Sequence, residues 1–85
     1  MKNEVEEWKD IRDFEGLYQV STFGRVKSLE RTAIGKGGGK WLRKEKILNP
    51  FTDKKGYLHV DLYRNGQTSH KSVHRLVAEA FILNP

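Results

Sequence analysis

The chain has 85 residues, of which 36% are hydrophobic and 32% are charged, and its net charge is +5. This length allows one domain or two very small subdomains around a thin core, and the absence of cysteine excludes disulfides, thiolate zinc sites and cysteine nucleophiles. No apolar run approaches the ~20 residues of a membrane span, and residues 1–6 lack the apolar stretch of a secretion signal, so we expect a cytoplasmic protein without a membrane partner.

Residues 1–15 carry Trp8, Ile11 and Phe14 at three-residue spacing. This spacing predicts a short turn or helical stub whose apolar side chains dock on the core. Gly16 ends the segment, because glycine is a poor helix former.

Short strands are expected next. Residues 17–21 and 25–29 read as two strands, and Gly24 in the tight turn between them supplies a positive φ. Residues 30–40 contain four glycines and two lysines, which predicts a mobile loop. Because the spacing of a P-loop is absent, we interpret it either as a cationic loop that follows a DNA backbone or as a plain linker. Residues 41–48 predict a third extended or mixed segment.

The clearest local pattern is the alternation of residues 57–63, which follows a predicted turn at residues 53–56. Asn65-Gly66 predicts a two-residue hairpin turn, since both positions need positive φ, and residues 67–73 return as the second strand. One face of the first strand is apolar and the other is polar or aromatic. The apolar face carries Leu58, Val60 and Leu62, and the opposite face carries Tyr57, His59, Asp61 and Tyr63.

The hairpin turn also fixes a register. It places Asp61 opposite His70, His59 opposite Ser72 and Tyr63 opposite Thr68. The same register puts Lys71 on the apolar face opposite Val60, which a β-bulge would correct.

The last segment predicts a helix over residues 74–82, with Ser72 as its N-cap. Its apolar stripe is expected to face the core and consists of Val73, Leu76, Val77, Ala80 and Phe81. Asn84-Pro85 predicts the helix exit. The predicted fold class is therefore α+β, with short antiparallel β-strands or hairpins followed by one C-terminal helix.

Few residues offer catalytic or metal-binding chemistry. His59, Asp61 and His70 share one face and are suitable zinc ligands, but cross-strand polar pairs are mostly structural, so we expect no metal site. His74 near the helix start has the chemistry of a general base. No carboxylate partner for it is evident, and we expect no catalytic residue.

Basic residues recur beside aromatic ones, and residues 16–85 hold thirteen basic and five acidic side chains. Lysine and arginine neutralise phosphates and release counterions, and a two-stranded ribbon fits the major groove of DNA. The sequence therefore favours double-stranded DNA as the partner, although the same charges would suit a solvated surface. The candidate DNA-binding residues are Arg25, Lys27, Arg31, Lys40, Arg43, Lys44, Lys46, Lys54, Lys55, Tyr57, His59, Tyr63, Arg64, His70 and Lys71.

Two stretches of the sequence resemble a known family. Glu7-Trp8-Lys9-Asp10-Ile11, residues 14–21 and residues 24–29 resemble the nuclease-associated modular (NUMOD) domain that opens many phage HNH homing endonucleases. Residues 55–63 and 73–81 are similar to the lead-in to the HNH nuclease domain. The resemblance implies a NUMOD-like DNA-binding module over residues 1–50. Residues 51–85 would then be a hairpin and helix resembling the start of an HNH domain, truncated before the catalytic motif.

In that family, the catalytic motif supplies a histidine base and the ligands of a divalent metal such as magnesium. It would follow Asn84-Pro85, and His74 corresponds to an upstream histidine of the family. The resemblance therefore implies the DNA-binding part of an HNH endonuclease, with no cofactor in this chain. Two alternatives stay open. One is a metal-dependent nicking enzyme whose remainder is supplied elsewhere, and the other is a phage protein-interaction or inhibitor module on a nuclease-like fold.

Overall fold

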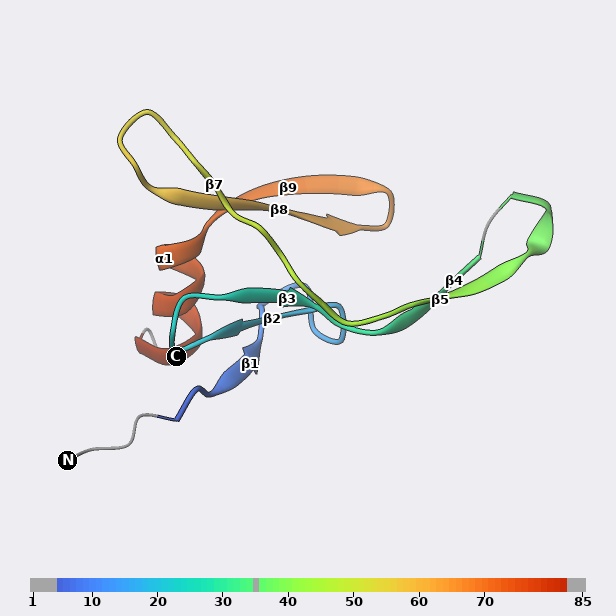
Figure 1. Cartoon of the computed structure of the whole chain (residues 1–85), viewed down its shortest axis with the longest axis horizontal. Coiled ribbons are helices and arrows are strands. Elements are labelled where there is room, and N and C mark those ends of the chain that lie inside the picture. Colours follow the sequence, from blue (N-terminus) through green and yellow to red (C-terminus); the bar gives the residue numbers. More distant parts are fainter. Residues whose placement is uncertain (1–4, 35, 83–85) are drawn as a thin grey trace.

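The computed structural model describes residues 5–34 and 36–82, which form three small antiparallel sheets and one C-terminal helix (Figure 1). This arrangement confirms the predicted α+β fold class. No helix in this part of the chain is long and apolar enough to cross a membrane. The predicted helix exit at Asn84-Pro85 and residues 1–4, part of the stretch where no secretion signal is expected, lie outside the described residues.

The first sheet has the strand order β1 (Trp8–Asp10), β2 (Tyr18–Ser21), β3 (Val26–Ser28) and β6 (Lys46–Ile47). β2 and β3 are the two strands expected from residues 17–29. Gly24 in the turn between them has a φ of 82°, and its amide donates to the carbonyl oxygen of Ser21 at 3.0 Å. β6 lies in the predicted extended segment and pairs with β3, so Lys27 is opposite Ile47.

The expected helical stub near the N-terminus is wrong, because Trp8–Asp10 forms β1 and pairs with β2. A turn follows, in which the amide of Phe14 donates to the carbonyl oxygen of Ile11 at 2.9 Å. Asp13 has a positive φ of 71°, which a right-handed helix does not contain. Ile11 and Phe14 are 2% and 5% exposed, so the predicted docking of these side chains on the core is confirmed.

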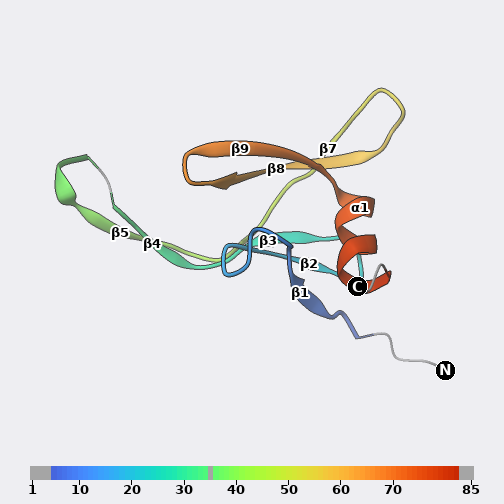
Figure 2. The same ribbon diagram turned by 180° about the vertical axis from the view of Figure 1, so that it is seen from behind.

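Residues 31–34 and 36–43 form a two-stranded arm instead of the loop expected for residues 30–40. Its strands are β4 (Arg31–Ile34) and β5 (Lys40–Arg43), joined by the 3-10 turn η1 (Lys36–Gly38). Gly37, Gly38 and Gly39, which helped to suggest a loop, lie between the two strands, and Gly37 has a φ of 86°. The residues on either side of these glycines therefore pair with each other as a hairpin. The arm projects away from the other elements in both views (Figures 1 and 2).

The third sheet consists of β7 (Phe51–Thr52), β8 (Leu58–Arg64) and β9 (Gln67–Ser72). Asn65 and Gly66 have φ values of 53° and 76°, which confirms the predicted hairpin turn. The predicted pairs are all present, including Val60 opposite Lys71, so no bulge corrects the register. Lys71 is half-buried on the core-facing side. Its long aliphatic stem makes that position tolerable. The strand β7 was not expected from the sequence.

The C-terminal helix begins as α1 (Val73–Val77) and continues as the π-helical turn η2 (Ala78–Ile82). Ser72 is its N-cap, as predicted, because its hydroxyl oxygen accepts a hydrogen bond from the amide of Arg75 at 3.4 Å. Val73 and Leu76 are buried, and the other members of the stripe pack against the core. The predicted orientation of the stripe is therefore confirmed.

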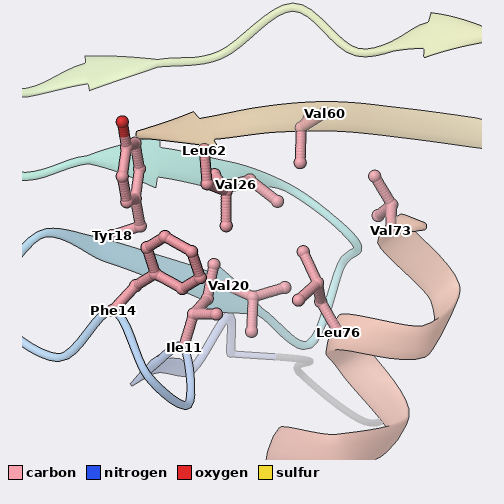
Figure 3. Packing of buried hydrophobic residues seen from close by; sticks show 9 residues of the cluster. All are labelled: Ile11, Phe14, Tyr18, Val20, Val26, Val60, Leu62, Val73 and Leu76. Carbon is pink, nitrogen blue, oxygen red and sulfur yellow. The ribbon is translucent and has the colours of Figure 1, made fainter. Parts of the chain in front are cut away.

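A single hydrophobic cluster lies between the first sheet, β8 and α1 (Figure 3). Its members come from both halves of the chain: Ile11, Phe14, Tyr18, Val20, Val26, Val60, Leu62, Val73 and Leu76. Leu58 was expected beside Val60 and Leu62, but it is 41% exposed. As the first residue of β8 it pairs with Thr52, at the end of the strand farthest from the hairpin turn.

Candidate nucleic-acid interface

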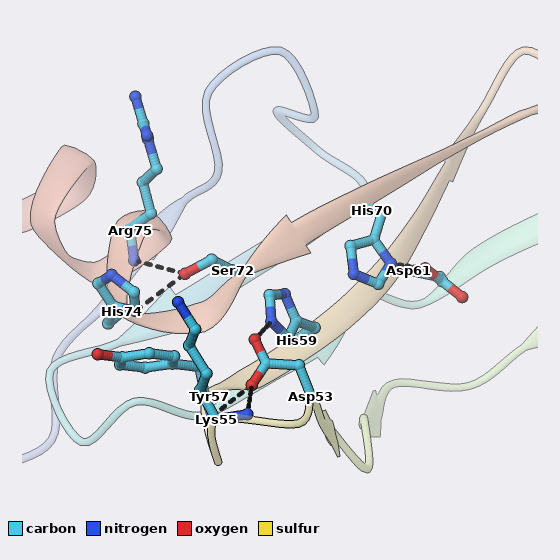
Figure 4. A network of polar contacts seen from close by, with 9 residues as sticks. All are labelled: Asp53, Lys55, Tyr57, His59, Asp61, His70, Ser72, His74 and Arg75. Atoms are coloured by element: carbon cyan, nitrogen blue, oxygen red, sulfur yellow. Dashed lines mark hydrogen bonds and ion pairs between the residues drawn. The ribbon is translucent and has the colours of Figure 1, made fainter.

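The outward face of the third sheet carries two stacked histidines (Figure 4). The ring centroids of His59 and His70 are 4.8 Å apart, and the planes are inclined by 26°. The ring of Phe51 lies 6.0 Å from His59 and 5.1 Å from His70. Sequence reasoning placed the histidines and Asp61 on this face but missed Phe51, because β7 is only two residues long.

Each of these histidines donates to a carboxylate. His70 Nδ1 lies 3.1 Å from Asp61 Oδ1, across the predicted pair, and His59 Nε2 lies 2.8 Å from Asp53 Oδ2. The Asp53 carboxylate also accepts hydrogen bonds from the amides of Lys55 at 2.8 Å and Tyr57 at 3.1 Å. The hydrogen bond from His59, aided by the two amides, lowers the pKa of Asp53. This residue fixes both a turn and a histidine, a role that the sequence pattern did not reveal.

The sequence favours structural cross-strand pairs over a metal site on this face. In residues 5–34 and 36–82, no group of three or more histidine or acidic side chains is placed to hold a metal ion. His59 and His70 direct ring nitrogens at Asp53 and Asp61 instead. The face is therefore a polar and aromatic surface within the described part of the chain.

His74 packs locally at the start of the helix. Its Nδ1 lies 2.9 Å from the hydroxyl oxygen of Ser72, and its ring centroid lies 5.5 Å from that of Tyr57. These contacts hold the His74 ring at the junction between β9 and α1.

Two of the candidate basic residues, Arg25 and Lys27, are engaged within the protein. Arg25 forms an ion pair with Glu6, and Lys27 Nζ lies 3.6 Å from Glu45 Oε2. Lys27 Nζ also lies 4.2 Å from the ring centroid of Trp8. The Arg25 guanidinium lowers the pKa of Glu6, and the Glu6 carboxylate raises the pKa of Arg25. These partners are distant in sequence, so spacing alone did not indicate them.

Four other basic residues meet at one groove. Arg31, Arg43, Lys44 and Lys46 line it from the base of the arm, while Asp61 and Tyr63 of β8 line its other side. Arg31 Nη1 donates to the carbonyl oxygen of Leu17 at 3.1 Å, and Nη2 lies 3.4 Å from the hydroxyl of Tyr18. The structure thus gathers residues that the sequence placed in a loop, in an extended or mixed segment and in a separate strand.

The remaining candidates are dispersed. Lys40 lies on the arm, and Lys54 and Lys55 lie in the exposed turn before β8. Arg64 donates to the carbonyl oxygen of Asp13 at 2.6 Å. Tyr57 and Tyr63 are 52% and 56% exposed, whereas Lys71 lies on the opposite side of the sheet from His59 and His70.

Comparison with known proteins gives consistent matches. The NUMOD4 motif matches residues 6–63. The chain is 39% identical over 75 residues to DNA endonuclease I-HmuI of Bacillus phage SP01, an alignment that covers 88% of this chain and 36% of that protein. A solved structure described as DNA binding and cleavage by the HNH homing endonuclease I-HmuI matches with a TM-score of 0.67 and 40% identity. That match also covers 88% of this chain and 36% of the other.

Proposed function

Because the chain belongs to the NUMOD4 family, we propose that it binds double-stranded DNA as the DNA-binding part of a phage HNH homing endonuclease. Membership of this family confirms the NUMOD resemblance, and the likeness to I-HmuI confirms the resemblance to HNH homing endonucleases. The chain spans 36% of the length of that relative. The observation that carries the proposal is the groove at the base of the arm, where four cationic side chains meet on a strand-built surface.

The proposal assigns binding, and not cleavage, to this chain. Residues 1–50 would form the NUMOD-like module, and residues 51–85 would form the hairpin and helix that lead toward an HNH domain. The contacts of His74 with Ser72 and Tyr57 support a packing role for this histidine. A protein that binds phage DNA would work in the cytoplasm of the infected cell.

Salt dependence tests the proposal directly. Each phosphate contact lowers the slope of log affinity against log salt by about 0.9, so four contacts give a slope near −3.6. Replacing Lys44 and Lys46 together with Ala should make that slope about 1.8 units shallower and weaken all duplex sequences similarly. The measurement is fluorescence anisotropy with labelled duplexes at several salt concentrations.

A double variant with the same change in charge provides the control. Arg12 and Arg75 lie on the helix side of the molecule, where Arg12 lines a pocket with Leu76 and Arg75 pairs with Glu79 at 3.8 Å. Replacing both with Ala should leave the salt slope unchanged. Equal effects of the two double variants would show that only net charge matters, and no binding by the parent chain at low salt would refute the proposal.

A plasmid-nicking assay separates binding from cleavage. We expect the chain to leave plasmid intact in magnesium or manganese at concentrations that shift duplex mobility. Nicking that is abolished by His74→Ala would instead favour the metal-dependent enzyme and would overturn the packing role of this histidine.

A further inference from the structure

The groove at the base of the arm gathers positive side chains at one place on the surface. It has a volume of about 330 Å³ and is lined by residues from the first sheet, from the base of the arm and from β8. Arg31, Arg43, Lys44 and Lys46 contribute four positive charges to one opening. Asp61 is the acidic residue that lines it, and its Oδ1 atom already accepts a hydrogen bond from His70.

The pairing of the arm places two of these cations directly against each other. Arg31 and Arg43 are opposite residues of β4 and β5. Like charges at opposite positions of an antiparallel pair destabilise the sheet. Among the described residues, no carboxylate forms an ion pair with any of the four cations, and neighbouring Glu45 pairs with Lys27 instead. The base of the arm therefore holds uncompensated repulsion that a bound anion would relieve.

Arg31 is held in a fixed position, unlike a typical surface cation. Leu17 accepts one hydrogen bond from its guanidinium, Tyr18 accepts a second, and the guanidinium carbon lies 5.1 Å from the centre of the Tyr18 ring. A guanidinium oriented before binding loses little rotamer freedom when it meets an anion, and its planar fork matches two phosphate oxygens.

Tyr18 supplies a further donor at the same place. Its side chain lines the groove, yet the residue is only 3% exposed. The hydroxyl oxygen accepts from Arg31 and from the amide of Tyr63 at 3.1 Å. A phenol also carries one hydrogen to donate, and none of the hydrogen bonds within the described residues uses it.

We propose that this groove is a preorganised site for one backbone phosphate of nucleic acid, bound between Arg31 and Arg43. The inference rests on the proposed function and names the point at which the duplex is held. A phosphodiester oxygen would accept from Arg31 and from the Tyr18 hydroxyl, while its negative charge would offset the repulsion between Arg31 and Arg43. Lys44 and Lys46 contribute charge at the rim.

The first test uses Arg43→Gln in the full 85-residue chain. Loss of one charge-assisted contact should weaken duplex binding about tenfold at low salt and make the salt slope shallower, by at most about 0.9 because Arg31 still faces the same phosphate. The same variant should melt at a higher temperature than the parent in low-salt buffer without DNA, because the opposed charges are removed. A contact that served only to stabilise the arm would lower the melting temperature instead.

Two companion variants separate geometry from charge. Arg31→Lys keeps the charge but loses the fork held by Leu17 and Tyr18, so affinity should fall while the salt slope stays near that of the parent. Arg12→Gln removes one charge outside the groove and should leave affinity and slope unchanged. Circular dichroism of each variant checks that the sheets are retained.

Thermal shifts with inorganic pyrophosphate distinguish a failure of the phosphate site from a failure of the proposed function. Pyrophosphate should raise the melting temperature of the parent more than that of Arg43→Gln. Parent-like DNA affinity in Arg43→Gln would overturn the phosphate site while leaving DNA binding intact. If the parent does not bind duplex but pyrophosphate stabilises it through Arg43, the anion site stands and the proposed function fails. Equal pyrophosphate shifts in both proteins would refute the site.

Discussion

At the scale of single residues, the basic side chains of this protein differ in whether their charge is already compensated. Arg25 is paired with Glu6, and Lys27 lies between Glu45 and the ring of Trp8. Arg31 and Arg43 face each other across the arm. A count of lysines and arginines treats these residues alike, whereas their surroundings assign them different roles.

Arg25→Gln should therefore affect folding more than DNA binding. The variant removes the ion pair that joins residue 6 to the start of β3, so its melting temperature should fall. Its salt slope with duplex DNA should match that of the parent, because Arg25 is held by Glu6. Glu6→Gln is the matched control and should not weaken DNA binding. A slope shallower by about 0.9 in Arg25→Gln would instead identify Arg25 as a direct phosphate contact.

Asp53 predicts an acid-sensitive contribution to stability. Its pKa is lowered in the folded protein by the hydrogen bond from His59, so this contribution is present above the unfolded pKa of about 3.9 and is lost as the pH falls through the lower folded value. Asp53→Asn should melt below the parent at neutral pH, and the difference should shrink as the pH falls below about 4 and disappear only below the lower folded pKa. Thermal melts followed by circular dichroism across this pH range measure it.

Glu30→Gln is a suitable control for that experiment because Glu30 is exposed at the end of the chain segment before β4. Its melting temperature should follow that of the parent at every pH. A difference between Asp53→Asn and the parent that grows as the pH falls would contradict the sign derived from the lowered pKa.

At the scale of elements, β8 offers two leucines with different burial in one strand. Leu62 is 0% exposed and Leu58 is 41% exposed. Leu62→Ala should destabilise the fold by about 2–5 kcal/mol because it leaves a cavity in the core. Leu58→Ala should cost less than about 1 kcal/mol. Urea denaturation of both variants checks this order, and similar losses would mean that Leu58 is also part of the core.

The hairpin β8–β9 was predictable because two independent signals agreed. The alternation of apolar and polar residues predicted which face of β8 lies toward the core. Asn65-Gly66 fixed the hairpin turn and therefore which residues of β8 and β9 lie opposite each other. A lysine on the apolar face opposite Val60 argued against this register. The turn determined the pairing nevertheless, and Lys71 lies half-buried on the core-facing side.

The arm was missed because it lacks the signal that reveals a strand. β5 is exposed at every residue, so burial imposes no alternation of apolar and polar side chains. The glycines of the turn dominate the composition of residues 30–40, and this composition is typical of a loop. The opposition of Arg31 and Arg43 depends on pairing across that turn, so it could not be inferred once the segment was read as a loop. The contact between Asp53 and His59 was also missed, because β7, which pairs with His59 and leads into Asp53, was not expected, although the turn at residues 53–56 was.

At the scale of the whole molecule, the protein is more extended than its length requires. Its radius of gyration is 14.5 Å, whereas a compact domain of this length has a value of about 12 Å. The arm accounts for much of this extension, since it projects from the sheets and none of its residues whose burial is described belongs to the hydrophobic cluster (Figure 1). An elongated cationic body is suited to lie along a duplex and contact several phosphates in succession.

The longest dimension sets an upper limit on the DNA footprint. The molecule is 52 Å long, and duplex DNA rises about 3.4 Å per base pair, so one chain should cover no more than about 15 base pairs. In anisotropy measurements with duplexes from about 8 to 24 base pairs, affinity should rise steeply up to about 15 and then level off. If the arm follows the backbone at one end of this footprint, deleting it should shorten the length at which affinity levels off. Full affinity on the shortest duplex would mean that the arm and the sheet face do not bind DNA together.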